Sequence, residues 1–190
     1  MNRRRFLTVG AMCAATGIAG CLSGGEVEEV EFQSTANDVP QEHPLHHEIA
    51  IQQPYLRSDE SPLTVELSVT NETDEPIVYG ERRQTLGLYK VSNDFVLLPE
   101  DDDRYKFSSD TDLWITTGPI DVTADYQTAE LDPSEAHSET LVLVAREGDG
   151  IPETIPAEFE FNIQFGATHK DEPIFGEEDY EWSFALQQQE

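Results

Sequence analysis

Cysteine and histidine are the residues of this chain whose types and spacing could do chemistry. Cys21 directly follows Ile18, Ala19 and Gly20, so one thiol stands after an aliphatic residue and two small ones. A thiolate is a nucleophile, and small neighbours let an enzyme approach the backbone closely. The other cysteine, Cys13, lies upstream in an uncharged stretch rich in alanine and glycine. Cys21 is therefore the first candidate for covalent modification.

The twenty residues before Cys21 have the layout of an export signal. Arg3, Arg4 and Arg5 form a basic start, and residues 6–20 carry no charge. A basic n-region followed by a short apolar h-region is typical of a secretory leader. The apolar part is shorter than the about 20 apolar residues that span a bilayer.

Two motifs in this leader resemble known export and processing signals. Arg3, Arg4, Phe6 and Leu7 match the twin-arginine signal, which addresses folded cargo for export. The resemblance implies that the protein is exported after it has folded.

The stretch Ile18-Ala19-Gly20-Cys21 resembles the cleavage box of lipoproteins. It implies that residues 1–20 are removed and that Cys21 receives a lipid. A two-chain lipid gives stable anchoring, since each buried methylene contributes about 0.8 kcal/mol. We therefore expect membrane lipid as a partner through Cys21, and a location on the extracellular face of the cell membrane.

Histidines form a second candidate site, because His43, His46 and His47 lie in one short segment. Converging neutral imidazoles can hold a metal ion at about 2 Å, and His169 or an acid could add a ligand. A solvated loop ahead of the first core strand is the alternative. We expect no resident cofactor.

Asn71, Glu72 and Thr73 form a glycosylation sequon in an expected turn. Asn71 is therefore a candidate for glycan attachment.

Nucleophilic catalysis has no support, because the chain has no Gly-x-Ser-x-Gly elbow and the expected mature form has no free thiol. We expect a protein that is not an enzyme.

The charge balance indicates the solvent. The chain has 11 basic and 39 acidic residues, and its net charge is −28 at pH 7. Such self-repulsion opposes compaction in dilute buffer, but at about 1 M salt the screening length falls to about 3 Å. The whole resembles a surface lipoprotein of a halophilic archaeon. The alternative is an acidic face for a cationic partner or metal ions. Nucleic-acid binding is not expected, because phosphate contacts need basic patches.

Strand patterns dominate the rest of the chain. Apolar and polar residues alternate over 63–69, 158–165 and 180–186, which is the period of a strand with one buried face. Short apolar segments separated by turn residues occur between them, and no long helical period is present. The pattern predicts an all-β, antiparallel β-sandwich of about 7–9 strands.

One turn adds a resemblance at the level of fold. Residues 131–135, Leu-Asp-Pro-Ser-Glu, resemble the Leu-x-Pro-Gly-Glu turn of immunoglobulin-like bacterial surface and inhibitor domains, with Ser134 in place of glycine. The resemblance covers this turn and the strand after it. It implies an immunoglobulin-like sandwich and says nothing about activity.

Together these observations divide the chain into three parts. We expect a signal peptide over 1–20, a lipidated cysteine and flexible acidic tether over 21–45, and an immunoglobulin-like sandwich over 46–190. The expected function is a non-catalytic binding or assembly module that works in high salt with a partner the sequence does not identify. The alternative is a metal- or ligand-binding accessory protein of a transporter or redox system.

Overall fold

Alternating side chains build the strands of this protein, and β11 (Glu158–His169) shows how. Its residues are alternately exposed and buried from Glu158 to Phe165, so one face carries acids and amides and the other carries aromatic and aliphatic groups. The neighbouring strand β12 (Tyr180–Gln188) repeats the pattern. Each of these strands therefore has one face for a core and one for solvent.

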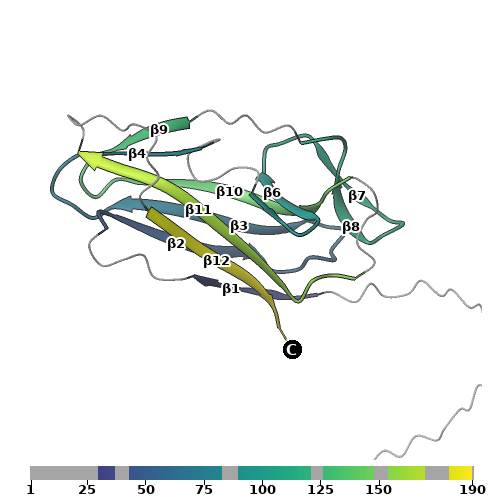
Figure 1. Ribbon diagram of the computed structural model, residues 1–190. Helices are drawn as coiled ribbons and strands as arrows, with labels where there is room; N and C mark the ends of the chain where they lie inside the picture. The colour runs from purple at the N-terminus through teal and green to yellow at the C-terminus, as the bar shows by residue number, and fades with distance from the viewer. Residues whose placement is uncertain are drawn as a thin grey trace, which may run out of the picture.

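The computed structural model describes residues 30–36, 43–82, 90–120, 126–147, 154–169 and 180–189, and these residues form two sheets (Figure 1). The other ten strands are β1 (Phe32–Ala36), β2 (Leu45–Gln53), β3 (Leu63–Asn71), β4 (Ile77–Arg82), β5 (Lys90–Ser92), β6 (Phe95–Pro99), β7 (Tyr105–Ser108), β8 (Leu113–Thr116), β9 (Tyr126–Leu131) and β10 (Ala136–Ala145). Among the described residues, no helix is long and apolar enough to cross a membrane.

The two sheets lie face to face. One has the order β1-β12-β11-β4-β9, and the other has the order β2-β3-β10-β6-β5, with β7 and β8 attached through β10. The strand pairs are antiparallel, apart from β8 beside β10, which is parallel at Ile115 and Ala145. The fold is thus an all-β sandwich, as the alternation predicts.

A shared core fills the space between the sheets. Buried rings from β11 and β12 face buried aliphatic side chains from β3 and β10. Phe159, Phe165 and Trp182 are among the largest fully buried side chains. Each buried aromatic ring removes roughly 150–250 Å² from water, which makes these strands the main source of core stability.

A second, smaller core lies on the other side of the seven-stranded sheet. Val96, Leu98, Val142 and Val144 point away from the main core, yet each is 0% exposed. The β7–β8 hairpin covers them, with Trp114 packed against this second cluster. β6 and the second half of β10 are therefore buried on both faces, which explains why these segments are continuously apolar and do not alternate.

The structure corrects two details of the sequence-based prediction. The described residues contain twelve strands, more than the predicted 7–9, because a strand as short as β7 shows no period and acidic neighbours hide β1. The sandwich also begins before residue 46. β1, in the range assigned to a flexible tether, pairs with β12, and its Phe32 is 1% exposed in the main core.

Candidate functional site

A groove lies on the outer face of the five-stranded sheet, over β1, β12 and β11. Its floor and walls follow from the register of these strands. Ala185 of β12 stands between Thr35 of β1 and Glu160 of β11, and Ser183 pairs with Asn162. The small side chains of Ala185 and Ser183 on β12 thus lie beside longer side chains on β11. The surface is therefore hollowed along β12.

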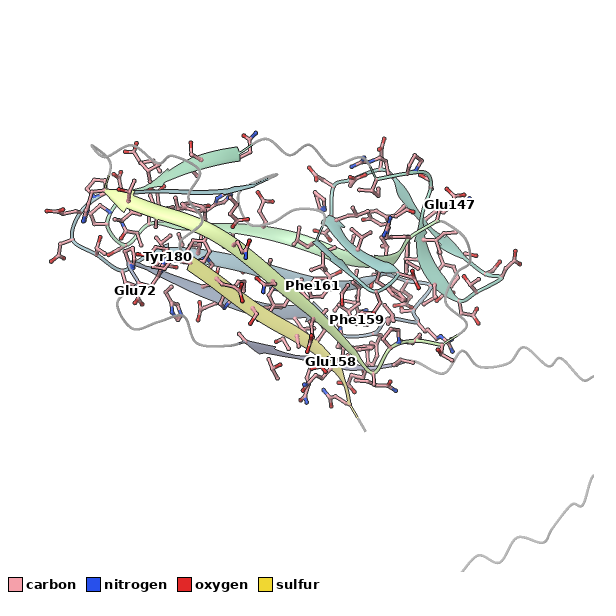
Figure 2. The ribbon with its side chains drawn as sticks, in the orientation of Figure 1. Glu72, Glu147, Glu158, Phe159, Phe161 and Tyr180 are labelled. Carbon is pink, nitrogen blue, oxygen red and sulfur yellow. The ribbon has the colours of Figure 1, made fainter. Side chains whose placement is uncertain are left out.

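The groove encloses about 490 Å³ and is lined mainly by polar side chains. The outward-facing residues that line it are Thr35, Glu158, Glu160, Asn162, Ser183, Ala185 and Gln187. Figure 2 shows Glu158 at the end of β11 that lies beside the last residues of β12.

Hydrogen bonds hold the groove in shape. Gln187 Nε2 donates to Glu158 Oε1 over 2.7 Å, which joins β12 to β11 across one end of the groove. The backbone N–H of Glu160 donates to Ser92 Oγ over 3.0 Å, which ties β11 to β5 of the other sheet. Carboxylates and amides on a framework of strands can bind cationic or hydrogen-bonding groups, and the charge-assisted bonds are the stronger ones.

The predicted histidine site is divided by the pleat of β2. His46 is exposed and lies 3.5 Å from Glu48 Oε1 on the outer face, measured from its Nε2 atom. His47, one residue later, is 5% exposed and points into the core. His169 lies at the end of β11, where its Nδ1 is 3.3 Å from Glu75 Oε2. We therefore correct the predicted set: His43, His46 and His47 do not converge on one point.

His43 and His47 instead meet inside an aromatic cluster. Their ring centroids are 6.2 Å apart, and His43 lies edge-on to Tyr180 at 4.1 Å. The His47 ring is 4.4 Å from that of Phe165 and 5.1 Å from that of Trp182. The cluster joins β2 of one sheet to the ends of β11 and β12 in the other, and Figure 2 shows Tyr180 at this end of β12.

Burial sets the protonation of this pair. Desolvation lowers the pKa of His47 to about 3, helped by the nearby His43 and His46. The pKa of His43 is lowered as well, because burial outweighs its hydrogen bond with the backbone of Leu45. Both rings are consequently neutral near pH 7, and neutral imidazole is the form that binds metals. The described residues contain no group of three or more His, Cys, Asp or Glu side chains arranged to hold a metal ion.

Asn71 lies in the interior, which excludes it as a glycan site in the folded protein. It is 0% exposed, and its Nδ2 donates to the carbonyls of Glu75 and Leu131 over 2.9 and 3.0 Å. Its Oδ1 accepts from the backbone N–H of Thr73 over 2.9 Å. The predicted glycosylation is wrong for the folded state, because both hydrogens that an attached sugar would disturb are used to hold two turns together.

A chain of polar groups joins the sheets at another point. The Tyr79 hydroxyl lies 2.6 Å from His137 Nδ1, and His137 Nε2 lies 3.3 Å from Glu139 Oε1. Sequence reasoning did not connect these residues, because they come from β4 and β10. Tyr79 is 0% exposed, so its hydroxyl is closed to solvent. The arrangement links the sheets and offers no accessible nucleophile.

The remaining predicted residues belong to the predicted leader and lie outside the described residues. They are Cys21, the predicted export residues Arg3, Arg4, Phe6 and Leu7, and the predicted processing residues Ile18, Ala19 and Gly20. The groove residues were missed for a different reason. Their alternation marks Glu158, Glu160 and Asn162 as outward-facing, but the hollow depends on which strands become their neighbours.

The fold and these sites define an all-β sandwich with a polar groove on one face and a histidine pair, one ring buried and the other partly buried, between its sheets. The chain belongs to the family described as "Domain of unknown function (DUF8130)", whose model matches residues 1–134. A comparison with curated proteins found no match. The family match ends at Ser134, in the turn before β10, so β10, β11 and β12 lie beyond it although they form the centre of the sandwich.

Proposed function

We propose that this protein is a lipid-anchored module on the outer face of the cell membrane, which binds a partner without catalysis in high salt. In this proposal the twin-arginine leader exports the folded chain, Cys21 carries the lipid, and the sandwich is of the immunoglobulin-like kind. The cell is a halophilic archaeon. The partner is a protein or ligand and not a nucleic acid.

The observation that carries the proposal is the groove over β1, β12 and β11. It is built on paired strands, so it is a rigid surface, and rigid surfaces hold binding groups more accurately than loops do. Its charged walls, Glu158 and Glu160, suit a partner that presents basic and amide groups. Between Cys21 and Phe32 the chain can span at most about 40 Å, so the groove would stay close to the membrane.

A charge reversal in the groove tests the binding function. Glu160→Lys should abolish crosslinking to a specific partner on intact cells at native salt, because a cation in the wall repels a basic group. The matched control is Glu72→Lys, an exposed position in the β3–β4 turn at the opposite end of the sandwich from Glu158 (Figure 2). Equal crosslinking by both variants would contradict the groove as the binding surface.

A second substitution tests the anchor independently. Cys21→Ser should leave the protein unprocessed or release it to the medium, since serine offers no thiol for the lipid. The measurement is the fraction of protein that sediments with membranes, together with the intact mass of the wild-type chain. Unchanged membrane retention of the variant would contradict the lipid anchor.

A specific observation favours a second function, that of a metal-binding accessory protein of a transporter or redox system. His43 and His47 are close together and neutral, with His47 buried and His43 partly buried, although His46 is not part of the pair.

A further inference from the structure

Several ring nitrogens in the cluster around His43 and His47 have no hydrogen-bond partner. They are Nε2 of His43, both Nδ1 and Nε2 of His47, and Nε1 of Trp182. A buried polar atom left without a partner costs about 1–3 kcal/mol, and native interiors contain few of them. Several such atoms in one cluster are a stronger indication of a missing ligand than any one of them alone.

In one of its two tautomers, the hydrogen bonding of His43 matches that of a metal ligand. Its Nδ1 lies 2.9 Å from the carbonyl oxygen and 3.0 Å from the backbone nitrogen of Leu45, so it donates to the oxygen in one tautomer and accepts from the N–H in the other. A ligating histidine commonly donates one ring N–H to a backbone carbonyl, which leaves the lone pair of the other nitrogen for the metal. In that tautomer the bare nitrogen of His43 is Nε2, the atom that is buried without a partner.

The separation of the two rings matches one cation between them. Metal–nitrogen bonds of about 2 Å on either side, added to the radii of two imidazoles, place ring centroids about 6 Å apart in a nearly linear arrangement. The observed separation of the His43 and His47 centroids is 6.2 Å.

We propose that His43 and His47 together bind one soft monovalent cation, Cu(I) or Ag(I), in nearly linear two-nitrogen coordination. Zinc is disfavoured, because structural zinc takes four ligands and the described residues supply no third carboxylate, thiolate or imidazole here. The surrounding rings of Phe165, Tyr180 and Trp182 would exclude water, and an aromatic face near a cation adds attraction. The proposal deepens the second function above and does not depend on the groove.

Silver titration of the full sandwich tests the proposal without redox chemistry. Ag(I) is added by calorimetry in about 1 M sodium sulfate, which screens the acidic surface and avoids chloride, a competing ligand. We expect one ion per chain and quenching of the Trp182 fluorescence, measured in a Trp114→Phe background. Titration with Zn(II) should show no binding that depends on these histidines.

Three variants locate the site. His43→Phe and His47→Phe should each weaken Ag(I) binding by more than the about 10–100-fold that loss of an outer-shell partner costs. Phenylalanine keeps an aromatic ring in the cluster, and thermal unfolding followed by circular dichroism checks that the variants fold. His46→Ala, on the other face of the same strand, is the matched control and should bind as the wild type does.

Four results would overturn the proposal. They are wild-type affinity in folded His47→Phe, loss of binding in His46→Ala, Zn(II) bound at the same two histidines, and absence of any 1:1 Ag(I) binding by the folded wild type. Because Glu160→Lys leaves the histidine pair intact, failure of this test and failure of the groove test can be told apart.

Discussion

The side-chain amide of Asn71 shows how one residue can hold two turns of the sandwich together. Its two donated hydrogen bonds reach the turn after β3 and the end of β9. Its backbone N–H donates to the carbonyl of Glu135, and its own carbonyl accepts from Ser134. The sequon is therefore a structural motif, and a one-dimensional pattern cannot distinguish this from a modification site because the two differ only in burial.

Loss of this amide should destabilise the protein. Asn71→Ala leaves the carbonyls of Glu75 and Leu131 without that donor, and we expect the free energy of unfolding to fall by about 2–3 kcal/mol. Denaturant titration at native salt measures the change. The exposed Asn162→Ala is the control and should stay within about 0.5 kcal/mol of wild type. A mass spectrum showing a glycan on Asn71 of the folded protein would contradict this assignment.

Ser134 occupies a backbone conformation that suits glycine. Its φ is 65°, in the left-handed region where a side chain is disfavoured by roughly 1–2 kcal/mol. We expect Ser134→Gly to raise the free energy of unfolding by about 0.5–1 kcal/mol, after the greater flexibility of glycine in the unfolded chain is counted. The control is Ser138→Gly in β10, where glycine should instead lower stability by about the same amount. Equal signs for the two variants would contradict the strain.

Because His47 is buried, the stability of the metal-free protein should depend on pH. The folded pKa is about 3, against about 6.5 in the unfolded chain, so between these values unfolding takes up a proton. Stability must therefore fall as the pH falls, by up to about 1.4 kcal/mol per pH unit. His47→Phe should remove about 2 kcal/mol of the loss between about pH 6 and pH 4. The measurement is the difference in free energy of unfolding between wild type and His47→Phe at each pH, because the many carboxylates titrate in both proteins. Identical pH profiles of the two proteins would contradict the burial of a neutral His47.

At the scale of elements, the β7–β8 hairpin turns an ordinary sheet face into a second core. The sequence indicates a short apolar strand near Trp114, but nothing local says that it covers β6 and β10. The indole Nε1 of Trp114 donates to the carbonyl of Ser58 over 2.8 Å, and its ring lies near those of Tyr105 and Phe107. The continuous apolar runs of β6 and of the second half of β10 are the sequence features that indicate strands covered on both sides.

Loss of a large side chain from this second core should cost as much as a comparable loss from the first. Leu98 faces the hairpin and is 0% exposed, so we expect Leu98→Ala to cost about 2–5 kcal/mol, the usual range for a buried leucine. The exposed Glu48→Ala in β2 is the control, with a change within about 0.5 kcal/mol. A loss below about 1 kcal/mol for Leu98→Ala would mean that the hairpin does not close over this face.

The predictability of the fold and of the sites also differs by element. Long alternating strands such as β11 and β12 are readable from the sequence, because period two is a local property. β1 is not readable, because acidic neighbours hide Phe32 and its partner β12 lies at the far end of the chain. Alternation alone shows that His46 and His47 face opposite ways. Only the packing of β2 on β11 and β12 reveals that His47 meets His43 and two larger rings.

For the whole molecule, the acidic surface predicts a dependence on salt. The chain carries 39 acidic residues against 11 basic ones, and dilute buffer leaves their repulsion unscreened over about 30 Å at 0.01 M salt. We expect the strand signal in circular dichroism to be lost on dialysis from about 2 M to about 0.01 M potassium chloride. Sodium chloride should restore it as well as potassium chloride does, and sucrose of equal osmolality should not. An intact sheet in dilute buffer would contradict the halophilic interpretation.

The pairing of β1 with β12 has a consequence for the order in which the molecule can be made. Phe32 stands opposite Gln188, so the first described strand completes its sheet against the last one. During synthesis β1 leaves the ribosome before its partner does, and it can pair only when β12 has also emerged. The edge of the five-stranded sheet, and the groove that depends on it, can therefore form only after β11 and β12 have been made.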